Sequence, residues 1–237
     1  MTDNRRRALV TAGRTGIGAA VADALRREGC DVWVTSRVPG QEDPRQLLLD
    51  ASASAGEVAR VVDIARPDIV VHCAAHFPPF ARVESADPVE LVRALEVKVL
   101  FGHALVRAAL PYLRSGGAGR VVWIGSAAGE YGAVGQSAYS AANSALTGLA
   151  RSLAIEEGRH GITVNVVVPG LVETARLKRE VSPAIRERIV ERTAVGRSGS
   201  PEEVADVVAF VSSAECGYVT GAVIPVDGGL GLGIGTG

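Results

Sequence analysis

Short apolar runs alternate with longer amphipathic stretches along this chain of 237 residues. The runs are rich in β-branched residues and read ALVTA, DVWVTS, IVVHCAA, GRVVWIGS and ITVNVVVP. Alanine-rich stretches with helical periodicity lie between them and predict helices over 16–28, over 88–113 and from about residue 138. The runs are apolar on both faces, as expected of strands covered by helices on each side. The pattern predicts an α/β fold, a single-domain Rossmann-type doubly wound parallel sheet flanked by helices.

The length of the chain fits one domain over 1–237, and no stretch has the composition of an interdomain linker. Only nine residues separate Arg37 from the apolar run Leu47–Leu49. Because a parallel crossover through a helix needs a dozen residues or more, we expect a short or irregular connection there.

Charge and cysteine content exclude several classes of function. The net charge is -1, so we expect no nucleic-acid partner, and the cluster Arg5–Arg7 is interpreted as a solvated approach to a strand. The three cysteines are widely spaced and lack metal-ligand spacing, which favours a reduced, cytoplasmic setting and no metal site. The first residues are polar and no run of about 18 apolar residues occurs, so we expect a soluble protein without membrane contact.

A glycine-rich loop, TAGRTGIG, follows the first predicted strand and opens the first predicted helix at 11–18. A tight turn alone would explain such a loop. Its place between strand and helix is also that of a dinucleotide fingerprint, where helix N–H groups bind a pyrophosphate and glycines allow close approach. The second strand ends in TSR, so Ser36 offers no carboxylate for a ribose 2′-hydroxyl, whereas Arg37 and Arg14 are suited to a 2′-phosphate. The expected cofactor is therefore NADPH/NADP⁺.

Five motifs occur in an order that covers nearly the whole chain: TAGRTGIG, VVHCAA, WIGSAAG followed by YSAAN, VVVPGLVET, and the C-terminal stretch from GRSGSPEEVADVV to VIPVDGG. Together they resemble the short-chain dehydrogenase/reductase family. The resemblance implies that Ser126 polarises a substrate carbonyl and that Tyr139, thirteen residues later, donates or removes a proton. The cofactor contacts that it implies are Thr11, Gly13, Arg14, Thr15, Gly16, Ile17, Gly18, Arg37, Asp50, Ala74, Pro169, Gly170, Val172 and Thr174.

Three departures from the family pattern stand out. Ala12 replaces the first glycine of the loop, and Cys73 and Ala75 replace the asparagine and glycine of the usual NNAG motif, which we expect to weaken a contact that stabilises the strand. The third departure is the pair Lys98 and Asn143. The family has lysine four residues after the tyrosine and asparagine in the upstream helix, so these two residues look exchanged.

The same exchange is a feature of the ketoreductase domains of polyketide synthases, which VHCAA, EVKVL and GQSAYSAANSAL resemble locally. Lys98 is then the cation that tunes Tyr139, and Asn143 completes the catalytic set. A unit charge about 5 Å away at an effective dielectric of about 20 is worth roughly 3 kcal/mol, which would bring the pKa of Tyr139 near 8. The alternatives are a surface lysine at 98, a turn serine at 126 and a core tyrosine at 139.

Two functions follow. The first is an NADPH-dependent reductase that converts a ketone to a secondary alcohol, or runs the reverse oxidation, with carrier-bound or CoA-bound β-ketoacyl groups as one substrate class. The second is a non-catalytic or non-redox partner subunit, which Ala12 and the altered NNAG segment favour. The segment 171–197 is expected to cover the substrate, and the resemblance implies a homotetramer or homodimer, with a heteromer as the alternative.

Overall fold

One parallel sheet of seven strands occupies the centre of the computed structural model, which describes residues 5–38 and 43–232. The strand order is β3-β2-β1-β4-β5-β6-β7, so the predicted doubly wound parallel sheet is confirmed. The strands are β1 Arg7–Val10, β2 Asp31–Ser36, β3 Gln46–Leu48, β4 Ile69–His72, β5 Arg120–Ile124, β6 Thr163–Pro169 and β7 Val223–Val226. The order reverses at β1, which pairs with β2 on one side and with β4 on the other.

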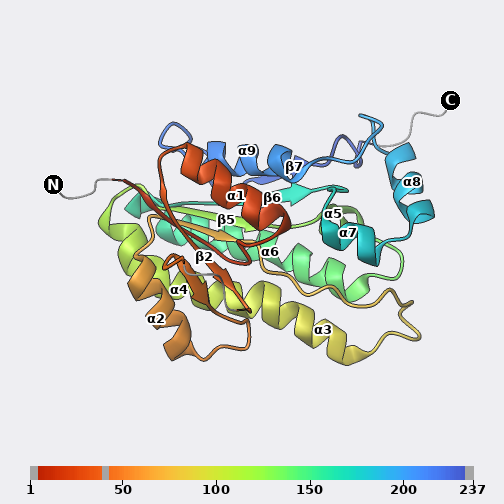
Figure 1. Cartoon of the computed structure of the whole chain (residues 1–237), viewed down its shortest axis with the longest axis horizontal. Coiled ribbons are helices and arrows are strands. Elements are labelled where there is room, and N and C mark those ends of the chain that lie inside the picture. Colours follow the sequence, from red (N-terminus) through yellow and green to blue (C-terminus); the bar gives the residue numbers. More distant parts are fainter. Residues whose placement is uncertain (1–4, 39–42, 233–237) are drawn as a thin grey trace.

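Helices cover both faces of the sheet (Figure 1). The helical elements are α1 Gly16–Arg27, α2 Ala55–Ala65, α3 Pro88–Leu95, η1 Glu96–Leu100, α4 Phe101–Ser115, α5 Ala127–Tyr131, α6 Ser137–Glu157, η2 Gly158–His160, α7 Ala175–Glu180, α8 Pro183–Glu191 and α9 Pro201–Ser212. One face packs against α1 and α9 and the other against α2, α4 and α6. Successive residues of one strand pack into opposite cores. Leu9 packs on the side of α2, α4 and α6, whereas Ala8 and Val10 pack on the side of α1 and α9.

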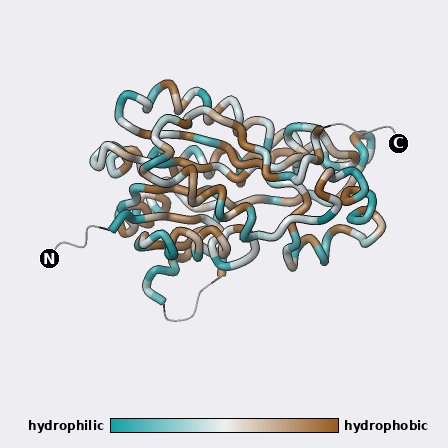
Figure 2. Tube along the Cα trace, turned by 90° about the horizontal axis from the view of Figure 1, so that it is seen from above, coloured by the Kyte–Doolittle hydropathy of each residue, from teal (hydrophilic) through white to brown (hydrophobic). Residues whose placement is uncertain are grey.

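This alternation explains the unbroken apolar runs of the sequence. Val70 of β4 faces the α2, α4 and α6 side, whereas Ile69 and Val71 face the α1 and α9 side. In Figure 2 the hydrophobic segments accordingly run through the middle of the molecule, and hydrophilic ones lie mostly toward the outside. Ser54 and Ser200 begin α2 and α9 with capping boxes, which satisfy the first backbone N–H groups of these helices.

One predicted helix differs in detail from the structure, and one predicted connection is described only in part. The helix expected over 88–113 contains α3, η1 and α4, and η1 is a π-helix that widens one turn at Lys98. Part of the connection between β2 and β3, residues 39–42, lies outside the described residues; no helix occurs in the described part of this connection. Within 5–38 and 43–232, no helix is both long and apolar enough to cross a membrane.

Candidate active site

All predicted site residues lie beyond the carboxyl ends of strands or on the helices that pack there. In a parallel sheet these ends share one edge, and the reversal of strand order between β1 and β4 marks the point on that edge where a doubly wound fold has its ligand crevice. The loops after β1 and β4 flank the crevice, and the segments after β5 and β6 extend it. Residues far apart in sequence are thereby brought together.

The glycine loop after β1 is shaped by close packing. A Cβ atom on Gly13 would lie 2.6 Å from Val34 Cγ1, and one on Gly18 would lie 2.4 Å from the Ala12 carbonyl oxygen. Gly16 has a φ of +54°, which favours glycine. Thr15 precedes α1 without a side-chain cap, in contrast to the capping serines of α2 and α9. The first N–H groups of α1 are therefore left to bind an anion such as a pyrophosphate, together with the backbone at Ile17.

Ala12 is accommodated in this loop at a cost. Its φ is 52°, in the left-handed region. A residue with a Cβ atom in this conformation is destabilised by about 1 kcal/mol relative to glycine. The replacement therefore strains the turn but keeps its path.

Basic side chains gather after β2, where the adenosine end of a dinucleotide would lie. Arg14 Nη1 donates to the Val38 carbonyl at 2.9 Å, so Arg14 reaches across to the end of β2. Asp50 follows β3 and accepts hydrogen bonds from Ser52, which together with the charge of Arg37 hold the pKa of this carboxyl below its usual value. The side chains of Arg37 and Asp50 are therefore close enough to interact electrostatically. Both are residues for which the sequence predicted cofactor contacts, and both lie at one end of the crevice.

The segment after β6 forms the other side of the crevice. A Cβ atom on Gly170 would lie 2.8 Å from Asp227 Cα, so glycine is required for this close approach. Pro169 ends β6, Val172 forms an isolated bridge with Gly199, and Thr174 caps α7 by accepting from Leu177 N at 3.1 Å.

A buried hydrogen-bond network joins the two strands at the crevice. Thr11 Oγ1 accepts from the N–H groups of Cys73 at 3.0 Å and Ala74 at 3.1 Å and contacts His72 Nδ1 at 3.0 Å. With both lone pairs occupied, the Thr11 hydroxyl donates to Nδ1, so the proton of the imidazole is on Nε2 and is donated to the Val97 carbonyl at 3.2 Å. The expected weakening of the strand contact at Cys73 is therefore offset by Thr11, which the sequence predicted only as a cofactor contact, and by His72, to which sequence reasoning gave no role.

Lys98 lies in η1, directly after the carbonyl that His72 binds. The side chain is 3% exposed, which rules out the surface-lysine interpretation. Its Nζ donates to the Ala74 carbonyl at 3.4 Å, and among the described residues no carboxylate pairs with it. Burial lowers the pKa of Lys98 to about 8, and the charge of Arg176 acts in the same direction. A buried ammonium without a carboxylate partner is costly, and such groups cluster at functional sites.

Ser126 and Tyr139 meet as predicted. Ser126 precedes α5 and accepts from Ala128 N at 3.2 Å, and its hydroxyl lies near enough to the phenol of Tyr139 to act on the pKa of that group. Tyr139 lies in the first turn of α6 and is 8% exposed. The two hydroxyl groups therefore converge on one point, as required to bind and protonate a single carbonyl oxygen.

Asn143 lies one turn after Tyr139 and is 3% exposed. Its Nδ2 donates to the Tyr139 backbone carbonyl at 2.8 Å, whereas its buried Oδ1 has no partner among the described residues. Gly129 lets α5 approach this point, because a Cβ atom there would lie 2.8 Å from Asn143 Cβ. The orphaned Oδ1 is suited to accept from a ribose hydroxyl, a water or an ammonium group.

The pKa of Tyr139 is raised, whereas the sequence predicted a lowered value. Desolvation by burial dominates, and the nearby Ser126 and Asn143 side chains and the charge of Arg176 oppose it only in part. Lys98 is not among the groups that shift this pKa; its ammonium interacts with Ala74, Cys73 and Arg176 instead. The expected value near 8 was therefore wrong, because it counted the charge and omitted the burial.

Phe77 and Arg176 also belong to the site, although no sequence motif pointed to them. The ring of Phe77 stacks on Tyr139 with centroids 4.6 Å apart and an interplanar angle of 27°. Arg176 Cζ lies 3.6 Å from the centroid of the same Phe77 ring. The aromatic residue shortly after the end of β4 was the available signal for Phe77, but only the fold shows that it faces Tyr139.

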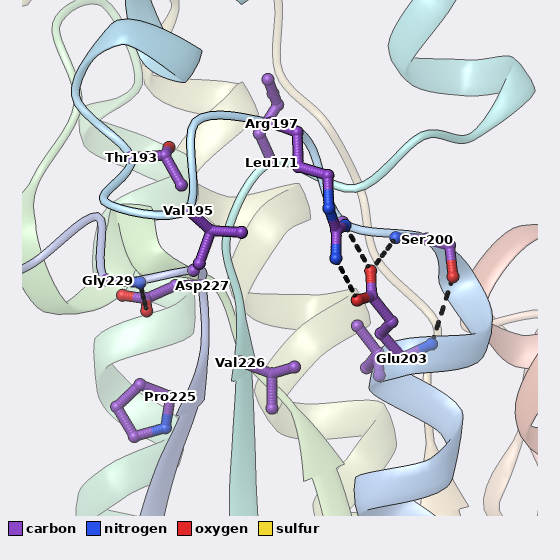
Figure 3. A pocket seen from close by; sticks show the side chains of 13 residues that line it. Leu171, Thr193, Val195, Arg197, Ser200, Glu203, Pro225, Val226, Asp227 and Gly229 are labelled. Carbon is purple, nitrogen blue, oxygen red and sulfur yellow. Dashed lines mark hydrogen bonds and ion pairs between the residues drawn. The ribbon is translucent and has the colours of Figure 1, made fainter.

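A pocket of about 350 Å³ lies apart from these residues, between the segment 193–200, the start of α9 and the end of β7. Figure 3 shows Arg197 turned toward Glu203, which it binds at 2.9 and 2.7 Å while Ser200 N donates to the same carboxylate at 2.8 Å. None of the residues that line the pocket is a predicted site residue. Across 5–38 and 43–232, no group of three or more His, Cys, Asp or Glu side chains is arranged to hold a metal ion.

The residues present fit a dinucleotide. The uncapped N-terminus of α1, the polar side chains after β2 and the orphaned Oδ1 of Asn143 match the pyrophosphate, the adenosine end and a ribose hydroxyl of a dinucleotide in turn. All three features belong to segments that border the one crevice.

Comparison with known proteins agrees with this geometry. Residues 11–231 match the protein-family model described as Enoyl-(Acyl carrier protein) reductase. The chain is 34% identical to (3R)-3-hydroxyacyl-CoA dehydrogenase of Rattus norvegicus, over 94% of this chain and 95% of the relative. It is 35% identical to 3-oxoacyl-[acyl-carrier-protein] reductase FabG of Pseudomonas aeruginosa, over 94% and 96% of the two chains. The crystal structure of the TT0495 protein from Thermus thermophilus superposes with a TM-score of 0.88 at 36% identity, over 95% of this chain and 98% of that one.

The buried imidazole of His72 predicts a specific loss of stability in acid. Burial, with the charge of Lys98, lowers its pKa from 6.5 to about 3, so between these values the unfolded chain binds a proton that the folded chain excludes. The contribution of His72 to the stability of the folded state is therefore highest above pH 6.5 and falls with the pH. The unfolding equilibrium constant rises by up to about tenfold for each pH unit between the two pKa values. Urea denaturation at pH 7, 6 and 5 should show a weaker acid dependence in His72→Gln than in the unmodified chain. His103→Gln, at an exposed position of α4, is the control, and equal slopes in all three proteins would contradict the prediction.

Proposed function

The chain belongs to the short-chain dehydrogenase/reductase family, and we propose that it is an NADPH-dependent ketoreductase, able to run the reverse alcohol oxidation. Family membership establishes an NAD(P)-dependent oxidoreductase acting on CH–OH and C=O groups. The observation that carries the finer proposal is the proximity of the Ser126 and Tyr139 side chains, close enough for Ser126 to act on the pKa of Tyr139, beside the crevice that fits a dinucleotide.

Carrier-bound or CoA-bound β-ketoacyl groups are the first substrate class to test. The relatives described above act, by their names, on a 3-oxoacyl group on acyl carrier protein and on a 3-hydroxyacyl-CoA. Both contain a carbonyl or hydroxyl group two carbons from a thioester. A similar catalytic pair in this chain supports the same reaction type.

In the proposed reaction the side chains of this protein bind one oxygen and move one proton. The Ser126 hydroxyl donates a hydrogen bond to the substrate carbonyl oxygen, and the Tyr139 hydroxyl gives its proton to the same oxygen as negative charge develops there. NADPH, when bound, supplies the hydride to the carbonyl carbon. The stack of Phe77 on Tyr139 covers one face of the phenol ring and limits the access of water.

Lys98 and Asn143 would restore the proton to Tyr139 and keep it oriented. The support is the burial of both side chains, the absence of a carboxylate partner for Lys98 in the described residues, and the orphaned Oδ1 of Asn143. Lys98 carries a proton at neutral pH and, with a pKa of about 8, can release it. We infer that these two residues have exchanged positions relative to the usual family arrangement.

The cofactor preference is the first test of the function. We expect the purified chain to reduce β-ketoacyl thioesters or simple ketones with NADPH, and to bind NADPH at least tenfold more tightly than NADH, which corresponds to about 1.4 kcal/mol. Arg37→Ala should remove most of this difference, because the 2′-phosphate of NADPH then loses its guanidinium partner. Ser36 offers no carboxylate that would favour NADH instead. Arg27→Ala, at the opposite end of α1, is the matched control. Equal affinities in the unmodified chain would refute the NADPH assignment, and no turnover with either cofactor would refute the function.

The role of Lys98 is tested by its removal. Lys98→Met should lower turnover by about a hundredfold or more, because the route that returns a proton to Tyr139 loses its donor, and should remove the limb near pH 8 from the pH profile of reduction, where Lys98 loses its proton. Asn143→Ala should cost less, because an amide acts only through hydrogen bonds. The double change Lys98→Asn with Asn143→Lys should recover more activity than either single change. Near-normal turnover with an unmoved pH profile in Lys98→Met would show that Lys98 has no part in the reaction.

Assembly into a homodimer or homotetramer is part of the proposal. Ile155 on α6 is 84% exposed and Tyr218, before β7, is fully exposed, so two large apolar side chains are available for a subunit interface. Sedimentation at micromolar concentration should show a dimer or larger species. A monomer would count against homo-oligomerisation, and a monomer that gains mass only with a second chain would favour the partner-subunit function.

A further inference from the structure

A guanidinium group stands over the proposed catalytic tyrosine with a single aromatic ring between them. Phe77 lies 4.6 Å from Tyr139, and Arg176 lies 3.6 Å from Phe77, measured from the guanidinium carbon to the ring centroid. The positive charge is therefore two stacking distances from the phenol. This position adjoins the space that the substrate must occupy to reach Ser126 and Tyr139.

Several contacts hold this stack in place. His76, next to Phe77, binds Glu90 of α3 through Nε2 at 2.6 Å, which ties the loop after β4 to that helix. Thr174 caps the helix that carries Arg176, and Arg176 Nε donates to Glu180 Oε2 at 3.0 Å. The arginine is thus oriented from both sides before any ligand binds, which reduces the entropy cost of using it for recognition.

The outer edge of the guanidinium is open to a ligand. Glu180 engages only Nε, and among the described residues neither terminal nitrogen of Arg176 has a hydrogen-bond partner. A planar fork of N–H donors in this state matches a carboxylate in a bidentate geometry.

The local charge also favours an anion. The segment 171–197 contains seven basic and four acidic side chains, although the whole chain carries a net charge of -1. The charge of Arg176 lowers the pKa of both Tyr139 and Lys98, so the arginine faces the catalytic groups electrostatically as well as sterically. Two cations, Lys98 and Arg176, therefore border a site whose reacting group is a neutral phenol.

We propose that Arg176 binds a free carboxylate of the substrate, so that the preferred ketone is an oxo acid whose carboxylate is joined to the carbonyl by a short carbon chain. The inference rests on the proposed ketone reduction and narrows its substrate class. A thioester has no charge at this distance from the ketone. The phosphate of a pantetheine carrier lies at the far end of the pantetheine group, much further from the ketone. A short oxo acid places its anion within the two stacking distances that separate Arg176 from Tyr139.

The test compares each acid with its neutral ester. The purified chain is assayed with NADPH on 3-oxobutanoate, 4-oxopentanoate and 5-oxohexanoate and on their methyl esters. We expect at least one acid to exceed its ester tenfold or more in kcat/KM. Arg176→Met should remove this preference by raising KM for the acid and not for the ester, while any change in kcat is shared by the two substrates, since a hydrogen bond to a charged group is worth about 1.5–3 kcal/mol, or 10- to 150-fold. Arg179→Met is the matched control, because Arg179 lies on the same helix and also binds Glu180.

The other outcomes separate the possible roles of Arg176. Equal turnover of acids and esters by the unmodified chain overturns the inference while leaving ketone reduction intact. An equal loss of kcat/KM for acid and ester in Arg176→Met, with a displaced pH profile, shows that Arg176 acts on Tyr139. A rise confined to the KM for NADPH shows that Arg176 binds the cofactor. Either result overturns the inference. If no ketone is reduced, the proposed function fails, but calorimetric titration with 4-oxopentanoate still tests the anion site. Binding that is lost in Arg176→Met and retained in Arg179→Met supports the inference. Equal binding by the unmodified chain and both variants overturns it.

Discussion

A neutral imidazole buried between two strands and a π-helix is the constraint on which the rest of the site depends. His72 accepts from Thr11 at the end of β1 and donates to Val97 in η1, so one side chain fixes the ends of both strands that flank the crevice and the turn that carries Lys98. Gly102 is required beside it, because a Cβ atom there would lie 2.3 Å from Trp123 and 2.9 Å from the imidazole. Since Thr11 also binds the N–H groups of Cys73 and Ala74, the loop that leads to Phe77 starts from the same network.

The π-helix makes this arrangement possible. In an α-helix each carbonyl is used by the residue four positions later, whereas the wider turn over Glu96–Leu100 changes this pattern and presents the Val97 carbonyl to His72. The same turn directs Lys98 inward to the Ala74 carbonyl. The ammonium of Lys98 and a protonated His72 would repel each other in this dry space, and the lowered pKa of His72 keeps only one of the two charged.

Sequence patterns predicted the fold well, because parallel strands covered on both faces leave an unmistakable run of β-branched residues. They also located the Ser126 and Tyr139 pair and the glycine loop, whose spacing follows from local geometry. Three features were beyond reach. The π-helix has no periodicity of its own in five residues, the role of His72 depends on contacts with Thr11 and Val97 that are distant in sequence, and the position of Arg176 over Phe77 arises only when the segments after β4 and β6 meet.

The raised pKa of Tyr139 bears on the direction of the reaction. A nearby cation stabilises a phenolate, but removing the phenol from water destabilises the same charged form, and here burial is the larger effect. Tyr139 is therefore fully protonated at neutral pH and holds the proton that ketone reduction consumes. A developing alkoxide is a much stronger base than a phenolate, so the transfer to substrate is downhill despite the raised pKa. Alcohol oxidation would instead need the phenolate as a base, and the surroundings of Tyr139 disfavour that form. Within the proposed function, the burial that outweighs the surrounding positive charge thus favours reduction over oxidation.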